Sequence, residues 1–161
     1  MPPALQLTVI KVGIFRIYNT KRDIQAIAQT LQSFGGVKCV YFGPALDAED
    51  TVVLAVVWND YALTQSFVKS EDFETYFKQL EDFATERPKT THCLLKDPSD
   101  ELKTLFTAVA IEMAPLKLKG DRIHQHYNNF IKAGKMIAAA KGYVAQFQQP
   151  QVEDPYVKAV V

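Results

Sequence analysis

The hydrophobic positions of the first hundred residues follow two periods, one near two and one near 3.6. Runs rich in β-branched and aromatic residues predict four strands, over residues 5–18, 37–42, 52–58 and 91–96. Stretches with an apolar residue every three or four positions predict two helices, one after the first strand and one after the third. The predicted order is therefore β-α-β-β-α-β.

The ends of the predicted helices carry typical capping residues. Asn19 or Thr20 can cap the first helix, and the pair Gly35-Gly36 ends it. Asp60 can cap the second helix. This order of elements is that of a ferredoxin-like α+β unit, in which two helices cover one face of a four-stranded sheet.

The third strand has no polar face. Residues 52–58 read Val-Val-Leu-Ala-Val-Val-Trp, without alternation between apolar and polar positions. A strand of this kind is buried on both sides, whereas a lone ferredoxin-like sheet would leave one face in water. We therefore expect a second layer over the open face of the sheet.

The end of the chain repeats part of its beginning. Residues 153–161 match residues 49–57 at six of nine positions. Upstream, residues 142–150 share with 36–44 the spacing of a glycine, an aromatic residue and a proline. Two matches in the same order favour a tandem duplication over a chance similarity between strands.

The repeat predicts two domains. Residues 1–98 form a complete ferredoxin-like unit, and residues 99–161 form a partial second copy in the order β-α-β-β, which would cover the apolar sheet face in an α/β-barrel-like arrangement. The elements expected in the second copy are a strand over 105–113, a helix over 121–141 and strands over 143–148 and 156–161. Either the natural chain continues beyond Val161 or the second copy is shortened.

The segment Val56–Asp60, followed by Phe67–Phe73, resembles the strand-to-helix segment of antibiotic-biosynthesis monooxygenases in the dimeric α+β barrel superfamily. The polar interruption Lys69-Ser70 within the helix is similar too. The resemblance implies two sheets packed face to face, either between subunits or within a duplicated chain. It implies a fold more closely than an activity, because one fold supports many activities.

Two departures from the superfamily narrow the implied activity. Haem-degrading members carry a histidine in the second helix, and residues 61–87 contain none. Plant cyclase members use a histidine in the third strand, which is apolar here. What the resemblance still implies is a small-molecule-binding protein, as a cofactor-independent oxygenase, cyclase or isomerase acting on a hydrophobic, aromatic or polyketide-like substrate. The alternative is a non-catalytic interaction or scaffold protein that dimerises through its sheet, and the lack of a compact catalytic constellation favours it.

Five residues of the first unit are candidates for a site. In members of the superfamily an aromatic residue at the position of Trp58 lines the pocket between sheet and helices, although Trp58 can equally close the core. Tyr18, Asn19 and Tyr41 lie at strand ends and are further ligand-binding candidates. His92, if it faces the helix-covered side, can act as a general base, and a hydrogen-bonded structural role is the alternative.

The remaining histidines and the cysteines predict no metal site and no cofactor. His124 and His126 are two residues apart on a predicted helix, so they point about 200° from each other and cannot share a metal. His124 can share a face with Tyr127, which makes these two further ligand-binding candidates. Cys39 and Cys93 are expected to be buried free thiols.

Charge and composition narrow the classes of partner that the chain is expected to bind. The chain of 161 residues carries 18 basic and 18 acidic side chains, which gives no reason to expect nucleic acid or an anionic membrane. A leader peptide and a membrane-spanning run are both lacking, so we expect a cytoplasmic protein. Residues 60–87 carry seven acidic and three basic side chains, and residues 115–141 carry one acidic and six basic. Solvated helix faces explain this asymmetry, or it promotes self-association between unlike surfaces.

Overall fold

The computed structural model describes residues 1–13, 20–95, 100–108, 111, 114–117, 123–138, 148–150 and 157–160. Contacts between Cα atoms divide the chain into two compact units, Met1–His92 and Cys93–Val161. This division lies inside a strand, six residues before the boundary that the sequence predicts after residue 98. Each unit is described by itself below.

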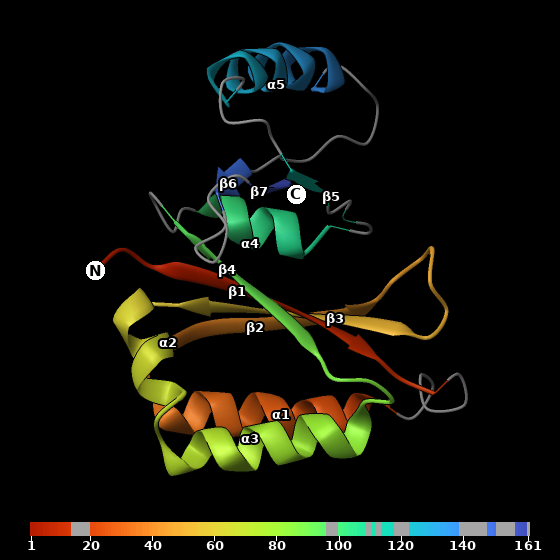
Figure 1. Cartoon of the computed structure of the whole chain (residues 1–161), viewed down its shortest axis with the longest axis vertical. Helices are drawn as coiled ribbons and strands as arrows, with labels where there is room; N and C mark the ends of the chain where they lie inside the picture. Colours follow the sequence, from red (N-terminus) through yellow and green to blue (C-terminus); the bar gives the residue numbers. More distant parts are fainter. Residues whose placement is uncertain are drawn as a thin grey trace. The chain divides into compact units, whose positions relative to one another are not determined.

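The first unit has the predicted ferredoxin-like α+β fold. Its four-stranded antiparallel sheet has the order β2-β3-β1-β4, and helices α1 and α3 lie side by side on one face of it (Figure 1). The elements, in chain order, are β1 (Ala4–Lys11), α1 (Thr20–Phe34), β2 (Val37–Pro44), β3 (Thr51–Trp58), α2 (Tyr61–Phe67), α3 (Glu71–Phe83) and β4 (Lys89–Leu94).

The first strand is shorter than predicted. The sequence places strand structure up to Tyr18, but β1 ends at Lys11, and residues 14–19 lie outside the described residues. The backbone N–H of Val12 donates to the carbonyl oxygen of Asp50 at 2.7 Å, one pair beyond the end of the ladder between β1 and β3. A continuous run of apolar residues therefore overstated the length of the strand.

The second predicted helix consists of two helices. α2 ends at Phe67, and α3 begins at Glu71 after the turn at Val68–Ser70. Ser70 separates them because its hydroxyl donates to the carbonyl oxygen of Phe67 at 2.7 Å and accepts from the backbone N–H of Phe73 at 3.3 Å. Ser70 is thus the N-cap of α3, at the polar interruption seen in the sequence.

The core of the first unit lies between the sheet and the helices. Side chains of alternate positions in β1 and β3 face α1 and α3, and several of them are completely buried, Trp58 and Leu54 among them. On the opposite face of the same strands Leu5 and Val57 are buried as well. Both faces of β3 are therefore apolar and buried, as its lack of alternation indicates.

The second unit begins with an unexpected helix. Its elements are α4 (Asp100–Phe106), β5 (Ala114–Lys117), α5 (Ile123–Ile137), β6 (Gln148–Pro150) and β7 (Val157–Val160). The strand predicted over 105–113 was wrong in its first part, because Leu105 and Phe106 belong to α4. The apolar residues 102, 105 and 106 have helical spacing, and Asp100 and Glu101 suit the first turn of a helix.

The small sheet of the second unit has the neighbour order of the first. β5 pairs with β7, and β7 pairs with β6, just as β1 pairs with β3 and β3 with β2. Val160 lies opposite Ala114, and its counterpart Val56 lies opposite Gln6. The shared pairing order supports the tandem duplication, which stays a prediction. Within the described parts of both units, no helix has the length and apolar character needed to cross a membrane.

Candidate functional site

A cluster of aromatic rings fills the space between β3 and the helices. Phe67, at the end of α2, is its centre, with ring centroids 5.1 Å from Phe34, 5.4 Å from Trp58 and 5.4 Å from Tyr76. Phe73 extends the cluster, 5.6 Å from Phe67. Most of these contacts are edge-to-face or tilted, which suits the quadrupoles of the rings. Phe34, Trp58, Phe67, Phe73 and Tyr76 are called the Phe67 cluster below.

A buried network of polar side chains adjoins the Phe67 cluster. The amide of Gln6 in β1 accepts a hydrogen bond from the indole N–H of Trp58 at 3.1 Å. The same amide donates from Nε2 to the hydroxyl of Tyr76 at 3.2 Å and to the hydroxyl of Thr8 at 3.3 Å. Gln6, Thr8, Trp58 and Tyr76 are each no more than 5% exposed. Buried polar groups of this kind are costly unless they are paired, and here they pair with one another.

The indole fixes the orientation of the Gln6 amide. An indole N–H can only donate, so Gln6 must turn its carbonyl oxygen toward Trp58. The Nε2 group then faces Tyr76 and Thr8, and both of its hydrogens are donated. The hydroxyl oxygens of Tyr76 and Thr8 are consequently acceptors toward Gln6, and their own hydrogens are left to be donated elsewhere.

Tyr76 is a neutral phenol over a wide pH range. Burial raises the pKa of Tyr76 to about 12, although its hydrogen bonds with Thr8 and Gln6 act in the opposite direction. Burial disfavours the charged phenolate, because a charge in the core loses its hydration. Tyr76 can therefore act at neutral pH as a hydrogen-bond donor or acceptor.

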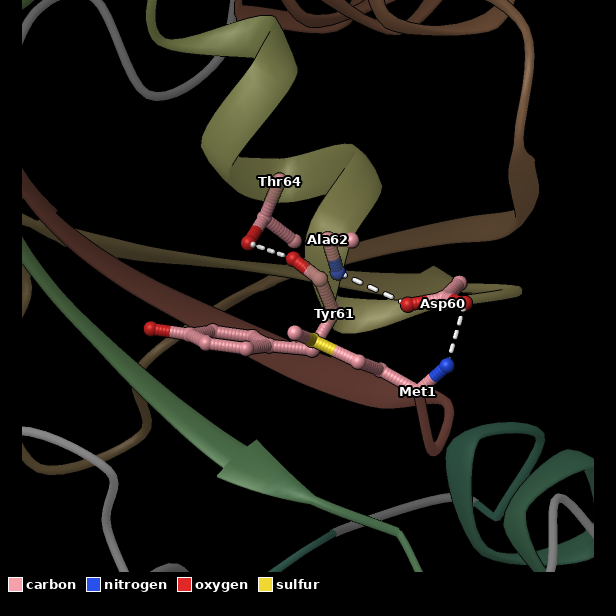
Figure 2. Close-up of polar contacts among 5 residues, drawn as sticks. All are labelled: Met1, Asp60, Tyr61, Ala62 and Thr64. Atoms are coloured by element: carbon pink, nitrogen blue, oxygen red, sulfur yellow. Dashed lines mark hydrogen bonds and ion pairs between the residues drawn. The ribbon is translucent and has the colours of Figure 1, made fainter.

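The start of α2 positions Tyr61 beside His92. Asp60 caps α2 by accepting from the backbone N–H of Ala62 at 2.8 Å, and its other oxygen binds the amino group of Met1 at 2.7 Å (Figure 2). These two partners lower the pKa of the Asp60 carboxyl, the amino group first. The ring of Tyr61 lies edge-on to His92, with centroids 5.9 Å apart.

Similar proteins are found among solved structures alone, since no family model and no curated protein matches the sequence. A provisionally assigned monooxygenase from Lactobacillus acidophilus NCFM aligns with a TM-score of 0.64 and 8% identity, over 99% of this chain and 75% of that one. A provisionally assigned antibiotic biosynthesis monooxygenase from Bordetella bronchiseptica aligns with a TM-score of 0.52 and 18% identity, over 57% of this chain and 95% of that one. The chain has the fold of the antibiotic-biosynthesis-monooxygenase-like proteins.

One further neighbour with this monooxygenase-like fold has a stated activity. A mutant of SnoaB, a cofactor-independent oxygenase from Streptomyces nogalater, aligns with a TM-score of 0.50 and 12% identity, over 62% of this chain and all of that one. At such identities the likeness concerns the fold, and function has to be argued from the site.

The structure brings two of the predicted site residues to the helix-covered side of the monooxygenase-like sheet. Trp58 lies in the Phe67 cluster, completely buried. His92 shares a face of β4 with Thr90, because the two are two residues apart in one strand. The hydroxyl of Thr90 contacts that of Thr8, which places this face of β4 toward α3. His92 therefore lies at the rim of the same layer, half-buried against Tyr61.

Tyr41 is not brought together with Trp58. It lies opposite Ala55 in the ladder, and Ala55 points away from the helices because its neighbours Leu54 and Val56 point toward them. Burial raises the pKa of Tyr41 to about 12, and the neighbouring Cys39 thiol adds to this. A ligand-binding role of Tyr41 would belong to the other face of the sheet and stays a prediction.

The other predicted site residues remain untested. Tyr18 and Asn19 lie outside the described residues. His124 and Tyr127 belong to α5, but their side chains are not described. Neither Cys39 nor Cys93 forms a disulfide; Cys93 is buried, as expected, whereas Cys39 is only half-buried. In the described part of the chain, no group of three or more histidine, cysteine and acidic side chains has a geometry that could hold a metal ion.

Sequence reasoning missed the polar half of the site. Gln6 and Thr8 are polar residues on the face of β1 that also buries Ile10. Two polar residues on a buried face were the sequence feature that could have predicted this part of the site. A lone tryptophan in a core also requires an acceptor for its N–H. The pairing with Tyr76 could not be predicted, since 70 residues separate it from Gln6 along the chain.

Proposed function

We propose that the first unit binds an apolar aromatic small molecule beside the Phe67 cluster and oxygenates it without a cofactor. The observation that carries the proposal is the polar network of Gln6, Thr8, Trp58 and Tyr76 within an otherwise apolar core. An apolar core alone would be more stable with apolar residues at these positions, since buried polar networks gain little stability. Aromatic walls with a few polar groups that converge are typical of small-molecule sites.

A ligand is expected to bind where the hydrogen bonds of the network are weakest. Both Nε2 hydrogens of Gln6 are donated within the network, so a ligand oxygen has to replace one of these bonds. The bond from Gln6 to Thr8 is the longest of the three, at 3.3 Å, and is the one to be replaced. The half-buried rings of Tyr61 and Phe73 lie at the border of the cluster, where a planar ligand can enter by displacing them.

The chemical step requires a base and exclusion of water. A phenolic substrate with an acidic C–H bond loses a proton to a base, and the resulting carbanion reduces dioxygen. One oxygen atom then forms the new carbonyl group and the other leaves as water, so the substrate itself supplies all the electrons. Within this proposal His92 takes up the proton, and the Gln6 amide donates a hydrogen bond to the substrate oxygen on which negative charge develops.

The test uses 1,8-dihydroxyanthrone as the substrate probe, in buffer with a metal chelator. We expect dioxygen uptake equal to the amount of quinone formed, which is followed by absorbance. His92→Gln should lower kcat by about 100-fold, because general bases contribute 10²–10⁴-fold. Gln25→Leu, an exposed position on α1, is the control that should leave the rate unchanged. A wild-type rate equal to that of buffer contradicts the proposal.

A second candidate is favoured by the closed packing of Trp58. Its side chain is completely buried and its N–H is already paired, as expected of a structural residue. We propose, as this alternative, an interaction or scaffold protein that self-associates, with the sheet face as the dimer contact. Sedimentation of the whole chain over a range of protein concentrations tests it, since a dimer held by an apolar sheet face dissociates on dilution. A monomer under all conditions argues against the alternative.

A further inference from the structure

The strand β2 forms one edge of the four-stranded sheet, with β3 beside it. Within the described part of the chain, no strand pairs with the other side of β2. The strand is eight residues long, its only charged residue is Lys38, and its Phe42 is 46% exposed. The opposite edge strand, β4, is polar in its first four residues. A long edge strand with exposed apolar residues is prone to pair with another chain.

The ladder with β3 shows which backbone groups of β2 point to its open side. The backbone N–H of Ala45, just after β2, donates to the carbonyl oxygen of Thr51 in β3 at 2.9 Å. Backbone groups along a strand point alternately to its two sides, so the odd-numbered residues from 39 to 43 also bond toward β3. The N–H and C=O groups of Val40 and Phe42 therefore point to the open side.

These backbone groups match those of a second copy of the same strand. When two β2 strands run antiparallel with Tyr41 at the two-fold axis, Val40 of each copy lies opposite Phe42 of the second copy. Each of these two pairs exchanges two hydrogen bonds. An axis at Phe42 would instead place Val40 opposite Pro44, which has no N–H. An axis at Val40 would place Phe42 opposite Lys38, where the strand has an irregular register.

Charged side chains favour the same alignment. With the axis at Tyr41, the exposed Lys38 of each copy lies opposite Pro44 of the second copy, at the start of the loop between β2 and β3. That loop carries the exposed acidic residues Asp47 and Glu49. Each copy thus brings a basic side chain to the acidic loop of the other, and the two lysines lie at opposite ends of the paired strands. Opposite charges placed in this way favour one register over others.

We propose that β2 is a homodimer contact, through which two copies of this chain join edge to edge into one continuous antiparallel sheet. The contact is isologous, with its two-fold axis at Tyr41. It uses the edge of the sheet, and so it differs from self-association through the sheet face. It requires no ligand, so it stands or fails independently of the oxygenase activity.

A cysteine at the two-fold axis tests the alignment. The Cα atoms of an antiparallel pair without hydrogen bonds lie about 4.5 Å apart, which a disulfide can span. We expect Tyr41→Cys in a Cys39→Ser background to form a disulfide-linked dimer at least about tenfold faster than Leu46→Cys in the same background. Leu46 is 85% exposed outside the strand, so its variant reports random collisions. Cys93 is completely buried and is kept in both variants.

Non-reducing electrophoresis at successive times of oxidation measures the two rates. Equal rates for the two variants, or a faster rate for the loop variant, overturn the proposal.

A charge on the edge separates this contact from one through the sheet face. Phe42→Lys places a cation at the edge, and Val9→Lys is the matched control, since Val9 is 40% exposed on the face of β1 that points away from the helices. We expect Phe42→Lys to raise the dimer Kd at least tenfold, and Val9→Lys to leave it within a factor of two, in sedimentation over a range of protein concentrations. A wild type that is monomeric at every concentration overturns the edge contact. A loss of affinity in Val9→Lys as large as that in Phe42→Lys overturns it too.

Discussion

At the scale of single residues, the amide of Gln6 organises the core of the first unit. It joins β1 to Trp58 of β3 and to Tyr76 of α3, three elements that are far apart along the chain. Removing the amide leaves Trp58 and Tyr76 without this hydrogen-bond partner. A buried polar group without a partner costs about 1–3 kcal/mol. Once the network is present, loss of one member therefore destabilises the fold whether or not a ligand binds.

Replacement of Gln6 tests this directly. We expect Gln6→Leu to lower the free energy of unfolding by about 2–4 kcal/mol, since both Trp58 and Tyr76 lose a partner. In the Trp58→Phe background the same change should cost about 1 kcal/mol less, because no indole N–H is then left unpaired. Urea denaturation of the four proteins gives the coupling energy. Gln29→Leu, exposed on α1, is the control. Additive effects would show that the indole bond carries no stability.

The phenol of Tyr76 should make stability depend on alkaline pH. Its pKa in the folded protein is about 12, against an ordinary value of 10.0, so folding favours the neutral form. That contribution is complete below pH 10 and is lost as the pH rises through 12. Between pH 9 and 11 the wild type should therefore lose about 1.4 kcal/mol more than Tyr76→Phe. Urea denaturation at the two pH values measures this, and Tyr41, with a similarly raised pKa, cancels in the comparison. Parallel losses in the two proteins contradict the assignment.

At the scale of elements, the sequence predicted the order of strands and helices in the first unit and where most of them end. Capping residues did this well: Asp60 begins α2, and Gly35-Gly36 follows α1. The length of an element was harder to predict where apolar residues continue without a capping residue. The predicted first strand was therefore longer than β1. Helix α4 was missed because residues 105–113 contain β-branched residues, and the shorter helical spacing before them was overlooked.

The two glycines after α1 make a matched pair. Both have left-handed φ angles, +84° for Gly35 and +80° for Gly36, so an alanine at either site costs about 1 kcal/mol. A Cβ atom at Gly36 would also lie 2.5 Å from Cδ1 of Leu63, whereas one at Gly35 would meet nothing within 4 Å. We expect Gly36→Ala to lower the free energy of unfolding by about 1 kcal/mol more than Gly35→Ala, because Leu63 must leave its rotamer.

The background Leu63→Ala is the control for the glycine pair. It should bring the two alanine variants to the same cost, as measured by urea denaturation. An equal cost of both variants with Leu63 in place would mean that the leucine turns away freely, and that the contact does not hold α2 against the end of α1.

At the scale of the whole molecule, the fold was predictable and the site was predictable only in part. The lack of alternation in β3 indicated two buried faces, and the position of Trp58 followed from the resemblance to monooxygenases. Tyr41 was grouped with Trp58, but the register of β2 against β3 puts it on the other face. Gln6, Thr8 and Tyr76 could not be grouped from sequence, since strand pairing and helix packing bring them together.

The second unit supports the duplication by its strand order, β5-β7-β6 against β1-β3-β2. A helix, α4, precedes its first strand and has no counterpart before β1, so the likeness between the units is one of sheet topology more than of every element. The Lactobacillus acidophilus neighbour aligns over nearly the whole chain, both units included. We therefore propose that the first unit provides the site and that the second copies its sheet.

The central claim is that an aromatic ligand binds beside Trp58. The fluorescence of Trp58 tests this claim most directly. Trp58 is the sole tryptophan of the chain, so all indole emission comes from the Phe67 cluster. We expect titration with 1,8-dihydroxyanthrone, without oxygen, to quench this emission saturably at one molecule per chain, after correction with free N-acetyltryptophanamide. Emission that follows the free indole up to the solubility limit of the probe would contradict the account.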